Sequence, residues 1–157
     1  MFWTTTAGKL LMTFLIAMTP VSELRGAIPY AAASGLNIWL AIVVAILGNL
    51  LPAPLVILFV RRIFAWLRRR ISFLNGFVTR IEERAKKKSQ QVKKSEFWGL
   101  VILVAIPLPG TGAWTGATVA AMMNMRLKRA FPAIALGVVI AGVVIGILSH
   151  TVGVLVR

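Results

Sequence analysis

The chain lacks cysteine and aspartate, and its 157 residues include a single histidine, His150. Without cysteine there are no disulfides, no thiol chemistry and no cysteine metal sites. One histidine and four glutamates leave too few ligands for a zinc or iron site. No Ser–His–Asp arrangement, phosphate-binding loop or pair of catalytic carboxylates can be drawn from the other residues. We therefore expect a protein that is not an enzyme and that uses no metal and no cofactor.

Negative charge is also scarce, since four acidic residues stand against 18 lysines and arginines and the net charge is +14. Twelve of the 18 lie between Arg61 and Lys94, and three more are Arg126, Lys128 and Arg129. Basic clusters beside membrane spans mark the cytoplasmic side, and they attract anionic lipid headgroups. The clustering indicates membrane orientation, and we expect no nucleic-acid partner.

Apolar residues are abundant, at 59% of the chain with a mean hydropathy of +0.86. Two stretches, Leu36–Val60 and Phe131–Val156, contain no charged residue. A helix needs about 20 such residues to cross a bilayer. The sequence predicts an all-α integral membrane protein, a single membrane domain over residues 1–157 that passes several times through the cell (plasma or inner) membrane.

Two further apolar segments are each interrupted by a break that contains proline and glycine. Each has two short arms around its break: Leu10–Met18 and Ala27–Ser34 around Thr19–Gly26, then Phe97–Ile106 and Ala113–Met123 around Pro107–Gly112. An arm of about ten residues, at 1.5 Å per residue, is too short for a bilayer core of about 30 Å. The favoured interpretation is a pair of re-entrant helical hairpins. In the alternative, every apolar segment crosses the membrane.

The two halves share one order of elements, a broken segment, an asparagine turn and a long span. An offset of 87 residues places Pro20 on Pro107 and Asn37 on Asn124. One span separates the halves, so the second is inverted relative to the first, which is a recurring transporter plan. We expect two inverted repeats, each a re-entrant hairpin plus a transmembrane helix, over residues 1–60 and 97–157.

The connection between the repeats, residues 61–96, has apolar residues at helical spacing among many arginines. This pattern is typical of a basic amphipathic helix on the membrane surface, here with a polar linker at Lys86–Ser95. The positive-inside rule places residues 61–96 and 125–129 in the cytoplasm. The first hairpin then opens to the outside, the second opens to the cytoplasm, and both termini lie outside.

Glu23 and Arg25 in the first break are the leading candidates for function. An ionisable group at membrane depth costs several kcal/mol unless it is paired or hydrated, so such residues are functional candidates. Glu23 could bind and release a proton, and Arg25 could hold an anionic group such as phosphate by bidentate hydrogen bonds. The alternative is an ion pair that only pins the tip of the hairpin.

Other residues of the two breaks are typical of a site wall. Irregular backbone at membrane depth occurs only inside protein or beside a water-filled cavity. Proline interrupts helical hydrogen bonding, glycine permits tight turns, and threonine and tryptophan add polar groups. Asn49 lies mid-span, where it either hydrogen bonds a hairpin backbone or lines the pathway. The predicted substrate- or proton-binding residues besides Glu23 and Arg25 are therefore Pro20, Pro29, Asn49, Pro107, Pro109, Gly110, Thr111, Gly112, Trp114 and Thr115.

Three motifs, Pro20–Pro29, Gly48–Pro52 and Ile106–Ala117, resemble the small multidrug export protein family over nearly the whole chain. That family is distantly similar to the DedA (VTT domain) superfamily. The DedA resemblance implies two opposed re-entrant hairpins and proton-coupled movement of polyprenyl-phosphate or phospholipid. It also implies that Glu23 and Arg25 form the polar tip of the first hairpin, and Pro107–Thr115 that of the second. The second break departs from the DedA pattern because it has no acidic residue and no arginine.

Three functions follow from these features. The first is a proton-coupled transporter that moves a lipid-phosphate or another amphiphile between the hairpins. The second is an exporter of cationic amphiphilic drugs, with Glu23 as counter-charge and Trp114 as stacking surface. The third is a membrane scaffold that does not transport. The expected partners are membrane lipids, the amphiphilic substrate, protons and a second copy of the chain in a homodimer.

Overall fold

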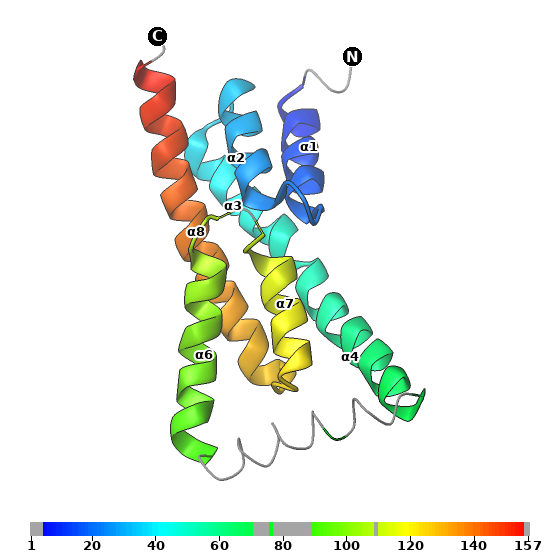
Figure 1. Ribbon diagram of the computed structural model, residues 1–157. Coiled ribbons are helices and arrows are strands. Elements are labelled where there is room, and N and C mark those ends of the chain that lie inside the picture. The colour runs from blue at the N-terminus through cyan, green and yellow to red at the C-terminus, as the bar shows by residue number, and fades with distance from the viewer. Residues whose placement is uncertain (1–4, 71–75, 77–88, 109, 156–157) are drawn as a thin grey trace.

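The computed structural model describes residues 5–70, 76, 89–108 and 110–155, and these residues form helices and turns without a strand. The all-α prediction is thus confirmed for this part of the chain. The helices, labelled as in Figure 1, are α1 Thr6–Met18, α2 Glu23–Ala33, α3 Ile38–Leu50, α4 Pro52–Arg70, α6 Ser89–Ala105, α7 Ala113–Met122 and α8 Leu127–Leu155.

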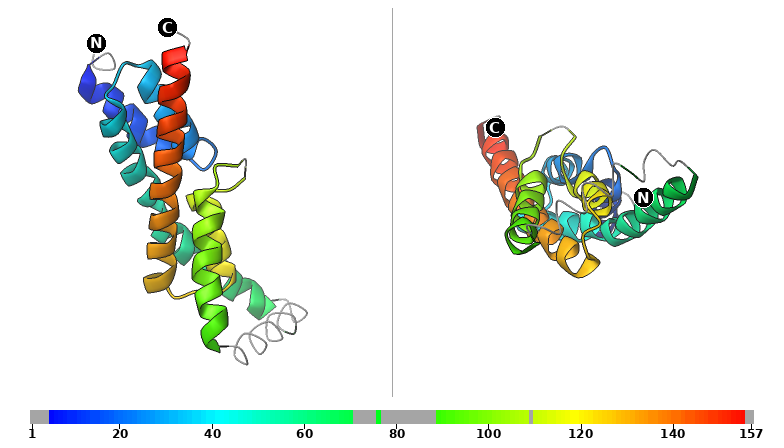
Figure 2. Two further views of the ribbon diagram at one scale, coloured as in Figure 1. Left: turned by 90° about the vertical axis from the view of Figure 1, so that its left-hand side faces the viewer. Right: turned by 60° about the horizontal axis from the view of Figure 1, so that its bottom comes forward.

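Helices α1 and α2 form an antiparallel pair that packs on α3, and α6 and α7 form another that packs on α8. Helix α7 also packs on α4. The α1–α2 turn and the α6–α7 connection face each other halfway along the molecule (Figure 1). The N- and C-terminal ends of the chain lie at one end of the molecule, and the α7–α8 turn lies at the other (Figure 2). Each pair therefore reaches only to the middle of the bundle.

The second helix of each pair ends in the same turn. Gly35 and Asn124 both have left-handed backbone, with φ of 75° and 54°. Leu36 N donates to Ala31 O, and Met125 N, after Asn124, donates in the same way to Ala120 O, five residues back. This is the Schellman motif, in which a left-handed residue closes the helix. Asn124 therefore corresponds to Gly35 at an offset of 89.

The prediction that Asn37 and Asn124 occupy equivalent positions in the two halves is wrong. Asn37 is the N-cap of α3, where its side chain accepts from Trp39 N at 2.9 Å. The offset is 87 before the tips and 89 after them, so the second half contains two more residues between the matched positions. An equivalent close contact between helices in each half shows both offsets, 87 for the residue before the tip and 89 for the glycine after it. Gly48 lies against Phe14 O and Gly137 against Val101 O, so that an added Cβ would lie 2.5 and 2.9 Å from these oxygens.

Two helical segments are long and apolar enough to cross a membrane, Ile38–Trp66 and Leu127–Val152. The first combines α3 with most of α4, and it bends at Leu51, before Pro52, which has no N–H to continue the hydrogen-bond ladder. Trp39 and Trp66 lie near its two ends, 68% and 59% exposed. At 1.5 Å per residue they are about 40 Å apart, the thickness of a bilayer with its headgroup regions. Tryptophans at both levels are typical of an aromatic belt.

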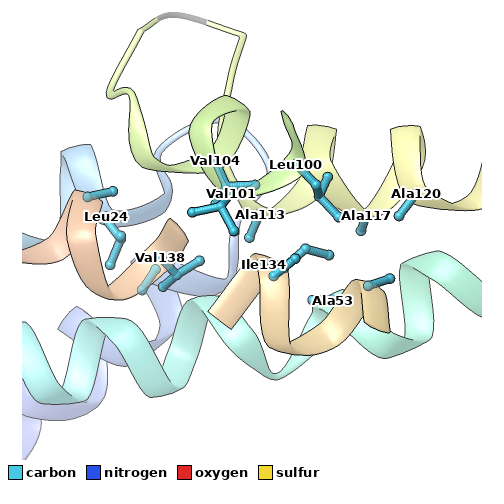
Figure 3. Packing of buried hydrophobic residues seen from close by; sticks show 14 of the residues in the cluster. Leu24, Ala53, Leu100, Val101, Val104, Ala113, Ala117, Ala120, Ile134 and Val138 are labelled. Carbon is cyan, nitrogen blue, oxygen red and sulfur yellow. The ribbon is translucent and has the colours of Figure 1, made fainter. Parts of the chain in front are cut away.

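The core is narrow and rich in alanine, which allows the helices to pack closely. Figure 3 shows side chains of α4, α6, α7 and α8 meeting in it, with Leu24 of α2 at one end. The fully or almost fully buried members include Ala53, Val104, Ala113, Ala117, Ala120, Ile134 and Val138. Most large apolar side chains outside this core, such as Leu55 and Ile147, are exposed on the long helices.

The basic connection differs from its prediction in two places. Helix α4 continues without interruption to Arg70, so no separate helix begins at Arg61. The predicted linker at Lys86–Ser95 is helical from Ser89, where α6 begins. Glutamine, lysine and glutamate form helices readily, and with Ser89 and their neighbours they extend the apolar arm by about two turns. The rest of the connection, residues 71–75 and 77–88, lies outside the described part of the chain.

Candidate functional site

The two breaks meet at the middle of the bundle, and the meeting point is built around Glu23. Glu23 is the first residue of α2 and is only 4% exposed. Its backbone is left-handed, with φ of 46°. A residue other than glycine in this region is strained by about 1–2 kcal/mol, and such strain is concentrated at functional sites.

The Glu23 carboxylate lies at the N-terminus of α7. Its Oε1 accepts from Trp114 N at 3.2 Å, and the carboxylate also accepts from the backbone N–H of Ala113. The N-cap residue of α7 is Gly112, which makes no side-chain cap hydrogen bond. The first N–H groups of a helix lack partners within the helix and carry a partial positive charge. Glu23 therefore caps α7 from the opposite hairpin.

Arg25 binds the same break at Thr111, just before α7 begins. Its Nη2 donates to Thr111 O at 2.7 Å. The Thr111 hydroxyl in turn donates within its own connection, where Ile106 O and Leu108 O lie at 2.6 and 2.8 Å. The connection thereby presents the Thr111 carbonyl to Arg25. Glu23 and Arg25 each bind backbone of the second hairpin, and the alternative of a purely structural ion pair stays open.

Trp114 completes the contact in the opposite direction. Its indole Nε1 donates to Met18 O at 3.1 Å, which is the carbonyl of the last residue of α1. The last carbonyls of a helix also lack partners within the helix. We call this set of contacts, formed by Met18, Glu23 and Arg25 with residues 111–114, the tip lock. In it each hairpin satisfies exposed backbone groups of the other.

Gly112 is required by the tip lock for a steric reason. Its φ is 130°, and a Cβ added to it would overlap the Glu23 carboxylate. Gly110 has φ of 84° but no atom within 4 Å of an added Cβ. Only Gly112 therefore lets the carboxylate reach the N-terminus of α7.

A small cavity lies beside the tip lock, with Glu23, Arg25 and Asn49 in its wall. Its volume is about 10 Å³, which is enough for about one water molecule. Asn49 on α3 is 0% exposed, and its Oδ1 and Nδ2 have no hydrogen-bond partner among the described residues. The far wall is apolar and comes from Val138, Ala141 and Ile145 of α8.

An apolar groove of about 200 Å³ lies between α3 and α8, nearer the end of the molecule that holds the termini. Trp39 and Ile42 line one side, and Gly146 and His150 line the other. Among the described residues no group of three or more acidic or histidine side chains could hold a metal ion.

Residues 23–144, more than half of the chain, match the model of the family described as "Putative small multi-drug export protein". The chain belongs to this family. No curated protein and no solved structure matches the chain. The family description names an export role, which is a transporter role and not an enzyme class. The relation to the DedA superfamily stays a prediction.

The structure brings some of the predicted site residues together. The tip lock contains Glu23, Arg25, Thr111, Gly112 and Trp114. Asn49 and Pro107 line the adjacent cavity, together with several residues of the lock.

The other predicted residues lie apart from the lock. Pro20 is exposed in the α1–α2 turn, and Pro29 is exposed inside α2, which continues past it, so Pro29 does not break the helix. Gly110 is exposed, and it accepts from the Thr115 hydroxyl at 2.9 Å. Pro109 lies outside the described residues.

The sequence prediction missed the carbonyl of Met18, the N–H of Ala113 and the α8 wall of the cavity. The first two are backbone groups, which no residue pattern specifies. The third had a signal, since an offset of 89 places Val138 on Asn49.

Proposed function

We propose that this exporter-family protein is a transporter of anionic amphiphiles, such as lipid-phosphates, coupled to protons. The observation that carries the proposal is the tip lock, in which a carboxylate occupies a helix N-terminus and an arginine occupies a backbone carbonyl. A helix N-terminus and an arginine are two favoured partners of phosphate and carboxylate groups. Glu23 therefore holds a position that an anionic substrate could take.

We further infer that α1–α2 and α6–α7 are re-entrant hairpins of two inverted repeats. Helices of 13 and ten residues such as α1 and α7 reach about 20 and 15 Å, short of a bilayer core of about 30 Å. The tips meet halfway along the molecule (Figure 1). The matching turns at Gly35 and Asn124 support the repeat. Irregular backbone in the hydrocarbon region needs polar partners, and the tip lock supplies them.

The chemistry of the lock links proton binding to substrate binding. A proton on Glu23 neutralises the carboxylate and weakens its hold on the N-terminus of α7. The N–H groups of α7 then donate to one phosphate oxygen of the substrate, and Arg25 donates to another instead of to Thr111 O. When the anion leaves, Glu23 releases its proton and caps α7 again. Proton and anion therefore bind together, and substrate binding is tighter at low pH.

Two features support an amphiphile over a small anion. The cavity at the lock holds about one water, so the hairpins must part before a headgroup enters. The groove between α3 and α8 is largely apolar and suits a hydrocarbon tail. Export of cationic drugs is the second candidate, because the family description names multi-drug export and Glu23 would supply the counter-charge. In that case the cation would have to draw Glu23 away from the two N–H groups and from Arg25.

The experiment is transport by the purified protein in liposomes, with labelled lipid-phosphate or a labelled cationic drug, with and without a proton gradient. We expect the gradient to drive lipid-phosphate transport, and Glu23→Gln and Arg25→Ala each to lower it at least tenfold. Glu96→Gln and Arg129→Ala, which make the same changes of charge outside the lock, serve as controls. Transport that survives both lock variants refutes the site. Transport of the drug alone selects the second candidate, and no transport of either favours a scaffold.

We propose that residues 61–96 and 125–129 face the cytoplasm and that both termini lie outside, because the positive-inside rule requires it. A reporter fused after Arg157 tests this orientation, and activity of the reporter in the cytoplasm contradicts it. We also propose a homodimer, since two long spans with mostly exposed outer faces enclose little space alone. Mass measurement in lipid nanodiscs tests the dimer, and a single-chain mass refutes it.

A further inference from the structure

Asn49 is a buried polar side chain that the tip lock does not use. It is 0% exposed, and neither its Oδ1 nor its Nδ2 has a hydrogen-bond partner among the described residues. The amide lies in the wall of the cavity that also contains Glu23 and Arg25. Burying an amide without partners is unfavourable, and nearly all buried polar side chains have one. The packing of the fold does not require the amide, because the corresponding residue of the second half is Val138.

The cavity limits what can bind to Asn49. Its volume of about 10 Å³ suits about one water and excludes a phosphate group. An amide offers a donor and an acceptor together, and water complements both. Arg25 in the same wall disfavours a metal cation. From α8 and α6 the cavity receives only apolar side chains, such as Val138, Ile145 and Val104. Glu23 and Arg25 are thus the charged residues that line the cavity together with Asn49.

Glu23 needs a proton donor that its present partners cannot supply. Its carboxylate accepts from the backbone N–H groups of Ala113 and Trp114, and Arg25 lies nearby. Backbone amides hold their protons, and a guanidinium is not deprotonated in proteins. A proton therefore reaches Glu23 only through a water molecule in contact with the carboxylate.

We propose that Asn49 binds one buried water molecule, and that this water delivers protons to Glu23. The Nδ2 group donates to the water and Oδ1 accepts from it, and the water's remaining proton points to the carboxylate. The water takes up a proton from solvent to become hydronium, passes a proton to Glu23 and remains as water. The relay rests on the proposed function, since it uses Glu23 as the proton site, whereas the water site itself does not.

Infrared spectroscopy of the full-length protein in lipid nanodiscs tests the relay without substrate. The difference spectrum against Glu23→Gln, recorded over a pH series, assigns the protonated carboxyl band of Glu23. A jump into D₂O shifts this band at the rate at which Glu23 exchanges its proton. We expect Asn49→Leu, which removes the polar group at similar size, to slow this exchange at least tenfold. Asn49→Ser keeps a hydroxyl for the water and should stay within about threefold of the unmodified protein.

Asn49→Val, which copies the residue of the second half, gives the same test if the leucine variant fails to fold. Equal exchange rates in the unmodified protein and in an apolar variant overturn the proposal. A band position or rate that changes with added NaCl but not with choline chloride also overturns it, because the occupant is then a cation. If exchange depends on Asn49 but no substrate is transported, the water site stands and the proposed function fails.

Discussion

Replacement of Gly112 by alanine probes the tip lock at its tightest point. The added Cβ would overlap the Glu23 carboxylate, so the carboxylate must leave the N-terminus of α7. It then loses two hydrogen bonds to backbone N–H groups, and a bond to a charged group contributes about 1.5–3 kcal/mol. We expect the free energy of unfolding to fall by about 3 kcal/mol or more from this loss alone.

Gly110→Ala is the matched control, because Gly110 also has positive φ but has open space around it. Its cost should be backbone strain of about 1–2 kcal/mol. Gly112, with φ of 130° and ψ of −167°, lies in a region that essentially only glycine adopts, so its variant carries more backbone strain than this in addition to the lost bonds. The assay is thermal unfolding in lipid nanodiscs. A difference of about 3 kcal/mol corresponds to about 6–12 °C in Tm for a chain of this length.

A double-mutant cycle with Glu23→Ala isolates the clash. Without the carboxylate, Gly112→Ala should cost only its own backbone strain, and therefore less than it costs in the unmodified protein. If Gly112→Ala lowers Tm equally with and without the Glu23 side chain, Glu23 does not lie against Gly112 and the lock as described is wrong.

Three further predictions concern individual contacts and turns of the fold, and each is read from Tm in nanodiscs. Gly48→Ala should lower Tm by several degrees, because the added Cβ would meet the backbone of α1. Gly99→Ala on α6 is the control, since its Cβ would meet nothing within 4 Å, and it should leave Tm equal or higher. Equal effects of the two variants would contradict the close contact at Gly48. Asn124→Ala should cost about 1 kcal/mol and Asn124→Gly less, because the residue is left-handed, and the reverse order would refute the turn. Trp114→Phe should cost about 1 kcal/mol by loss of the bond to Met18 O, and no change in Tm would mean that the bond contributes nothing.

The sequence predicted the positions of the helices well, because the signals are strong. Runs without charge marked the two long spans, and proline and glycine marked both breaks. The arms met these expectations within a few residues. The exception is α6, which begins at Ser89 because its polar residues are good helix formers.

The register between the halves could be predicted only in part. Pro20 and Pro107 gave the offset before the tips, but the identity of two asparagines suggested that it continued unchanged. Asn37 caps a helix while Asn124 closes one, and asparagine suits both roles. Because both residues are asparagines, the sequence alone did not reveal that the offset between the halves increases by two residues.

The candidate site shows the same limit. Glu23 and Arg25 stood out because charges are rare in apolar segments. Their partners are the backbone N–H groups of Ala113 and Trp114 and the carbonyl of Thr111, which every residue possesses. The conformation of the second tip brings these backbone groups to Glu23 and Arg25, and Gly112 is the residue in the sequence that most clearly indicates this conformation.

The central claim is that the two tips are held together by Glu23 and part when it is neutralised. Spin labels at Val21→Cys and Leu108→Cys, exposed positions in the two tips, report their separation, and the chain has no other cysteine. The distance between the two labels is measured by pulsed electron–electron double resonance in nanodiscs. The labelled protein is diluted with unlabelled protein, so that the distance is measured within one chain. We predict one narrow distance distribution at neutral pH, and a second, longer distance at low pH and in Glu23→Gln at any pH. An unchanged narrow distribution in Glu23→Gln and at low pH would contradict the claim.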